Sequence, residues 1–118
     1  MDSSWYAVTI DCADVPAQTR FWGALLGRPP ADRPAPEHAV LLPGEGSAGP
    51  RLVFNQVPEP KTVKNRVHLD LITQQAETET RRLLVLGATV LRVFEENGRH
   101  RWTTFADPEG NEFDLISG

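Results

Sequence analysis

The stretch Val67-His68-Leu69-Asp70-Leu71 alternates apolar and polar side chains, and the pair Leu86-Gly87 follows it fifteen residues later. An alternation of period two is typical of a half-buried strand. Behind this strand we expect a helix from about residue 74 to residue 86, with Thr73 as its N-cap and Gly87 as its end. The spacing therefore predicts a strand that leads directly into a helix.

The same plan occurs about 60 residues earlier in the chain. Residues 5–11 form a predicted strand, because every second residue from 6 to 10 is apolar. Asp14 is the expected N-cap of a helix that has Pro16 near its first position. This helix reaches about Leu26, and Gly27 ends it. A strand, a helix and a Leu-Gly pair thus recur in each half of the chain.

Each Leu-Gly pair is followed by further strand-like segments. These predicted strands cover residues 38–42, 51–57, 89–94, 101–105 and 112–116. Residues 28–37 hold four prolines, Pro34 among them, and are expected to form an edge strand or a loop. A linker between two domains is the alternative, but neither half has enough apolar residues for its own core. The pattern predicts an α+β fold with two βαβββ modules, about 1–60 and about 61–118, in one domain of residues 1–118.

Composition excludes several classes of function. The net charge is −4, and the basic residues are scattered, which argues against a nucleic-acid-binding surface. No apolar run approaches the roughly 20 residues needed to cross a bilayer, and the polar start is not a signal peptide. The single cysteine, Cys12, cannot form an internal disulfide and fits a reducing compartment. We therefore expect a cytoplasmic protein without a nucleic-acid or membrane partner.

Alternation along the strands assigns each side chain to one of two faces. Val67, Leu69, Leu71, Phe105, Phe113 and Leu115 are expected on the side of the helix. The opposite face then collects Arg66, His68, Asp70, His100, Trp102, Thr104, Glu112 and Asp114. Such a face is either simply solvated or a concave ligand site, and the pattern alone leaves both interpretations open.

Two segments carry a resemblance to a known family. They are Lys-Asn-Arg-Val-His-Leu-Asp at 64–70 and Asp-Pro-Glu-Gly-Asn-Glu-Phe at 107–113. Together with Phe21-Trp22 and the two Leu-Gly pairs, they resemble the glyoxalase-like branch of the vicinal-oxygen-chelate superfamily, the glyoxalase/bleomycin-resistance/dioxygenase family. The resemblance implies a cup-shaped mixed sheet with helices on its outer face, a small-molecule ligand in the cup and a homodimer.

Metal-dependent members of that family bind a divalent ion with one side chain from each of four strands. The resemblance places two of these ligands on His68 and Asp114. Ala7 stands where a histidine or glutamine is expected, and residues 54–56 supply no carboxylate. Two protein ligands are few for a divalent cation in a catalytic site. We therefore expect no cofactor, or a weakly held divalent metal at His68 and Asp114.

Three functions remain open at this level. The first is a bleomycin-resistance-like module that binds a small molecule in the sheet cup without a tightly bound metal. Its expected ligand-binding residues are Trp5, Ala7, Phe54, Arg66, His68, Asp70, Trp102 and Asp114. The second is a divalent-metal-dependent lyase, isomerase or dioxygenase of the glyoxalase type that uses His68 and Asp114. The third is a structural role. The sequence identifies no catalytic residue, and whether the chain is an enzyme stays open.

Overall fold

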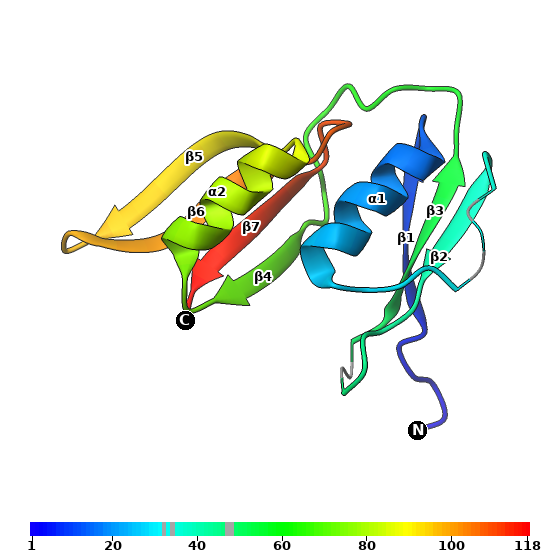
Figure 1. Cartoon of the computed structure of the whole chain (residues 1–118), viewed down its shortest axis with the longest axis horizontal. Coiled ribbons are helices and arrows are strands. Elements are labelled where there is room, and N and C mark those ends of the chain that lie inside the picture. Colours follow the sequence, from blue (N-terminus) through cyan, green and yellow to red (C-terminus); the bar gives the residue numbers. More distant parts are fainter. Residues whose placement is uncertain (32, 34, 47–48) are drawn as a thin grey trace. The chain divides into compact units, whose positions relative to one another are not determined.

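The computed structural model describes residues 1–31, 33, 35–46 and 49–118, which form two compact units (Figure 1). The first unit is Met1–Pro60 and the second is Lys61–Gly118. Each unit has one mixed sheet and one helix, which is the α+β composition predicted from the sequence. No helix in the described part of the chain is long and apolar enough to cross a membrane.

The first unit contains β1 (Ala7–Cys12), α1 (Val15–Leu26), β2 (His38–Leu41) and β3 (Arg51–Gln56). Its strand order is β1-β3-β2, with β1 parallel and β2 antiparallel to β3. The predicted ends of α1 are confirmed. Asp14 Oδ1 accepts a hydrogen bond from the Ala17 N–H at 3.0 Å, and Gly27 ends the helix with a φ of 64°. Trp22 on this helix is fully buried.

The proline-rich segment of the first unit is reduced to an isolated bridge between Pro30 and Leu41. The Ala31 N–H donates to the Val40 carbonyl at 2.8 Å, and the Leu42 N–H donates to the Pro29 carbonyl at 3.2 Å. Proline has no N–H to donate to a ladder, so this segment cannot extend into a full strand. The expectation of an edge strand or loop is therefore confirmed for the described residues, and Pro34 lies outside them.

The second unit contains β4 (Leu69–Thr73), α2 (Ala76–Leu86), β5 (Thr89–Glu96), β6 (Arg99–Ala106) and β7 (Glu112–Ser117). The strand order is β4-β7-β6-β5, with β4 parallel to β7 and the other pairs antiparallel. This is a complete βαβββ module. Helix α2 lies across one face of the sheet (Figure 1), and we call the other face the helix-free face.

The core of the second unit lies between α2 and the sheet. Phe105, Phe113 and Leu83 are fully buried, and the Phe105 and Phe113 rings stack with centroids 5.6 Å apart. The predicted helix-side position of Phe105 and Phe113 is thereby confirmed. Val67 is different, because it precedes β4 and is exposed instead of packed on the helix. Leu84 on α2 is also about half exposed.

The start of α2 differs from the prediction. The helix begins at Ala76 with Gln75 in the N-cap position, and no side chain caps it. Thr73 is still part of β4, where it pairs with Ser117. Its Oγ1 accepts a hydrogen bond from the Gln75 N–H at 3.0 Å, which closes the turn between strand and helix. The hydroxyl thus stabilises the turn before the helix and not the first helical residues.

Candidate functional site

Strand register places four polar side chains in a line across the helix-free face. Asp70 on β4 is opposite Asp114 on β7, Asp114 is opposite Thr104 on β6, and Thr104 is opposite Arg92 on β5. Paired residues of neighbouring strands project to the same side of a sheet. We call these four residues the polar row.

A second line of side chains lies two residues further along each strand. It consists of Ile72, Ile116, Trp102 and Phe94, one from each strand, and we call it the apolar row. Ile72 is 74% exposed, Phe94 42% and Trp102 36%. The Trp102 and Phe94 rings are stacked, with centroids 4.2 Å apart and an interplanar angle of 17°. The helix-free face therefore carries a continuous apolar strip directly beside a polar one.

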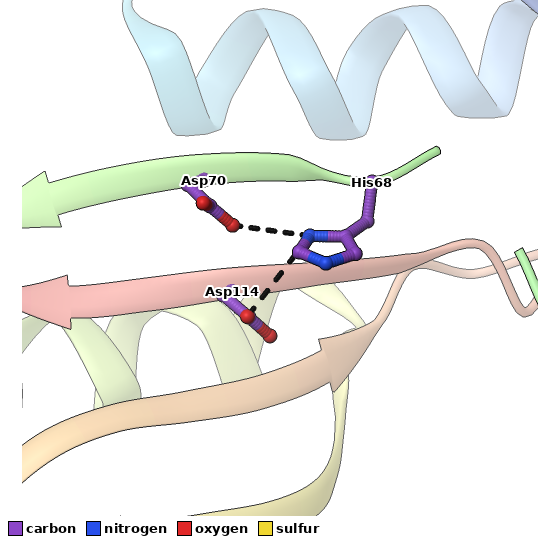
Figure 2. Close-up of side chains that lie close together, drawn as sticks. All are labelled: His68, Asp70 and Asp114. Atoms are coloured by element: carbon purple, nitrogen blue, oxygen red, sulfur yellow. Dashed lines mark ion pairs between the residues drawn. The ribbon is translucent and has the colours of Figure 1, made fainter. Parts of the chain in front are cut away.

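His68 joins the two carboxylates of the polar row into a cluster. Its Nδ1 lies 3.0 Å from Asp70 Oδ1 and 4.0 Å from Asp114 Oδ2 (Figure 2). One ligand atom from each of the three residues lies within 4.8 Å of the other two. Thr104 Oγ1 donates to Asp114 Oδ1 at 2.6 Å, which fixes the second carboxylate from the opposite side. We call His68, Asp70 and Asp114 the cluster.

The cluster carries an excess of negative charge. Asp70 and Asp114 lie directly opposite each other on neighbouring strands, an arrangement that destabilises a sheet unless something compensates for it. The imidazole of His68, which is partly exposed, lies within 4.0 Å of both carboxylates and can do so. It can carry at most one positive charge against two carboxylates. The arrangement therefore favours a cation or a hydrogen-bond donor at this point.

The loop ahead of β4 is attached to β7 through Asn65. The Asn65 side-chain N–H donates to the carbonyl oxygens of Glu112 and Val67, and its Oδ1 accepts from the Glu112 N–H. These bonds of 3.2–3.3 Å hold the last residues before the strand. They explain how His68, which is outside β4, is kept beside Asp114.

Glu112 is the third carboxylate near this face, and it is already paired. Its Oε1 lies 3.3 Å from Lys64 Nζ and 3.8 Å from an Arg92 guanidinium nitrogen. Desolvation raises the pKa of Glu112, but the hydrogen bond from Lys64 and the charges of Lys64, Lys61 and Arg92 together outweigh it and lower the pKa. Glu112 is thus paired with Lys64 and with Arg92 of the polar row, whereas Asp70 and Asp114 lie beside His68.

The structure brings together four of the residues expected from the sequence: His68, Asp70, Trp102 and Asp114. Arg66 is exposed in the segment that precedes them. The remaining three belong to the first unit, which is described by itself. There Trp5 is exposed ahead of β1, and Ala7 is the first residue of β1. Phe54 is fully buried opposite Ile10 and Ala39, in a core position.

His100 lies on the other face from the one expected. Phe94 pairs with Trp102, but the next residue, Glu95, pairs with His100, so Arg101 is an extra residue on β6. This β-bulge reverses the alternation of side chains at that point. The His100 ring accordingly contacts helix-side residues, with Nδ1 2.5 Å from Ser117 Oγ and Nε2 2.7 Å from Thr103 Oγ1.

Sequence reasoning missed Phe94 and Ile72 as parts of the site. Ile72 could have been found, because it follows Asp70 by two residues and therefore shares its face. Phe94 could not, because a second register shift between Val90 and Arg92 breaks the alternation along β5. Only the pairing with Trp102 places Phe94 in the apolar row.

Comparison with known proteins gives one consistent family. A family model described as a glyoxalase-like domain matches residues 7–116. No protein of curated function matches the chain.

Several solved structures share the fold over the whole chain. A mutant of the fosfomycin resistance protein FosX from Listeria monocytogenes, complexed with Mn(II) and 1S,2S-dihydroxypropylphosphonic acid, is 16% identical with a TM-score of 0.77. The aligned part covers 100% of this chain and 91% of the FosX chain. A glyoxalase/bleomycin resistance protein/dioxygenase family enzyme from Burkholderia phytofirmans is 19% identical over 98% of both chains, with a TM-score of 0.73. A glyoxalase-related enzyme from Fulvimarina pelagi is 20% identical with a TM-score of 0.73, over 100% of this chain and 89% of the other.

Proposed function

This chain belongs to the glyoxalase-like domain family of the vicinal oxygen chelate superfamily, and from that premise we propose that it binds a small molecule on the helix-free face of the second unit. The single observation that carries the proposal is the polar row beside the apolar row. A sheet face with exposed aromatic and branched apolar side chains next to a pair of carboxylates is typical of a binding surface.

The dimensions of the two rows suit a small organic molecule. Neighbouring strands lie about 4.8 Å apart, so four strands offer a strip roughly 14 Å wide. Residues two apart on one strand are separated by about 6.7 Å, which is then the distance between the rows. A ligand would place an apolar body on Trp102 and Ile116 and a polar group at the cluster.

A fragment screen followed by amide NMR titration tests this proposal. Fragments that bind should shift the amide signals of β6 and β7 residues in both rows, and Trp102→Ala should weaken their binding at least several-fold. Val85→Ala is the matched control, because Val85 is an exposed apolar residue on α2 and outside the helix-free face. Fragments whose shifts map away from both rows would contradict the proposal.

A second candidate is a divalent-metal-dependent lyase, isomerase or dioxygenase, which the cluster favours. One imidazole nitrogen and two carboxylate oxygens within 4.8 Å of one another form a donor set that divalent transition metals accept. Asp70 supplies a third ligand from within the second unit, beside His68 and Asp114. Bound there, a metal would supply Lewis-acid chemistry to adjacent ligand oxygens.

The chain's own residues contribute positioning to this candidate. The Thr104 hydroxyl holds the Asp114 carboxylate in one orientation, as hydrogen bonds to ligating carboxylates do in metal sites. The Asn65 bonds to β7 hold the segment that carries His68. Both would limit the movement of ligand atoms when a metal is removed.

Elemental analysis and titration with manganese, nickel, zinc and ferrous iron decide between the two candidates. Stoichiometric binding that disappears in His68→Ala and in Asp114→Ala supports the metal-dependent enzyme. Glu95→Gln is the control, because Glu95 is a carboxylate of the same sheet on the other face. Metal binding no tighter than about micromolar supports the metal-free binding function instead.

We also propose that the protein is a homodimer and that it is cytoplasmic. Light scattering would test the first proposal, and expression with a fluorescent tag would test the second.

A further inference from the structure

Resting on the proposed binding function, we infer that the ligand of the helix-free face is an organic cation: a protonated amine joined by a short linker to a flat apolar body. The charge of the cluster selects the amine, and the apolar row selects the flat body. The distance between the rows sets the length of the linker.

The charge argument compares the two ends of the polar row. Lys64 and Arg92, which is itself part of the row, each have a nitrogen within 4.0 Å of Glu112 Oε1, and this one carboxylate offsets only one of their two positive charges. The selection therefore rests on the close contacts at the cluster itself. There, among the described residues, the imidazole of His68 is the cationic group that lies within 4.0 Å of both Asp70 and Asp114. An incoming ammonium meets two carboxylates there, whereas an incoming anion meets repulsion.

The shape argument rests on the aromatic pair. Trp102 stacks on Phe94 with an interplanar angle of 17°, so one face of its indole is covered by its β5 neighbour. On its other side Trp102 has Ile116 of β7 as its cross-strand neighbour. A flat ring is the shape that extends such a stack, and a π face also attracts cations. Ile72 continues the strip to β4 and gives the body further apolar contact.

The linker follows from the strand geometry. Asp114 and Ile116 are two residues apart on β7, so their side chains stand about 6.7 Å apart along the strand. A ring on the apolar row therefore reaches the carboxylates with an amine held about two or three methylene groups away. Tryptamine has this form. Tryptophol carries a neutral hydroxyl in place of the amine, and indole-3-acetate carries a negatively charged carboxylate on a side chain of the same ring system.

Titration of the metal-free, EDTA-treated protein with these three probes, followed by amide NMR, tests the inference. Tryptamine should bind about three- to tenfold more tightly than tryptophol, and indole-3-acetate should bind most weakly. The double variant Asp70→Asn/Asp114→Asn should lose the preference for tryptamine while it keeps the affinity for tryptophol. Glu95→Gln, which removes one negative charge from the other face, should leave the preference unchanged.

The outcomes separate this inference from the function on which it rests. If tryptamine binds no more tightly than tryptophol, but both shift signals of the two rows, the charge selection is wrong and the binding function stands. If none of the probes shifts those signals, and fragments do not either, the binding function fails as well. Should the double variant not fold, raising the salt concentration to about 0.5 M replaces it, because screening must weaken a preference that is electrostatic. A preference that is unchanged at that salt concentration overturns the inference.

Discussion

Phe113 and Phe94 offer a direct test of which face of the second sheet is core and which is available for ligand. Both are phenylalanines in neighbouring parts of one sheet, but Phe113 is fully buried and Phe94 is 42% exposed. Phe113→Ala removes a ring that stacks on Phe105 at 5.6 Å and leaves a cavity under α2. Core truncations of this kind lower the free energy of unfolding by about 3–5 kcal/mol.

Phe94→Ala should cost less, because the ring keeps much of its surface in water in the folded protein. Partial burial of a phenylalanine contributes about 1 kcal/mol, and the lost stacking on Trp102 adds about 0.5–1.5 kcal/mol. We therefore expect a loss of about 1.5–2.5 kcal/mol for this variant, clearly below that of Phe113→Ala.

Urea denaturation monitored by circular dichroism gives the two free energies from the midpoints and slopes. Hydrogen exchange of the β7 amides provides a second measurement that reports on the second unit alone. Fragment binding distinguishes the roles of Phe94 and Phe113 further, since Phe94→Ala should weaken fragment binding while the protein stays folded. A larger loss of stability for Phe94→Ala than for Phe113→Ala would refute the assignment of the faces and, with it, the two rows.

Three further predictions concern single residues. Thr104→Val should lower the free energy of unfolding by about 1.5–3 kcal/mol, because it leaves the Asp114 carboxylate without its 2.6 Å donor, and Thr104→Ser should restore most of it in the same denaturation assay. Gly27→Ala should cost about 1–2 kcal/mol, since its φ of 64° is unfavourable for any residue with a Cβ, whereas Gly44→Ala, where no positive φ occurs, should be near neutral. Glu112 has a lowered pKa in the folded state, so the stability that it contributes is present above its ordinary pKa of about 4.3 and is lost as the pH falls through the lowered value. Denaturation between about pH 5 and pH 3 should therefore show a smaller loss of stability in Glu112→Gln than in the wild type, and equal losses would contradict the pairing with Lys64.

Local signals in the sequence were sufficient for most of the fold. Asp14 and Gly27 mark the ends of α1, because capping depends on hydrogen bonds and backbone angles within a few residues. Alternation placed Phe113 correctly in the core and Asp114 opposite to it, since neighbouring residues of a regular strand must project to opposite faces. The α+β composition and the paired carboxylates of the site could be predicted for the same reason.

Tertiary structure decided what local patterns do not contain. The bulge at Arg101 turned His100 to the helix side, and the shift near Leu91 brought Phe94 beside Trp102. Register depends on the hydrogen bonds between strands, which no single segment specifies. Phe54, which the resemblance offers as a ligand-binding residue, is fully buried opposite Ile10 and Ala39, and strand pairing sets this position. The sequence by itself thus determined the elements and the chemistry of the carboxylates, while strand pairing determined which side chains meet them, because that pairing joins residues far apart in the chain.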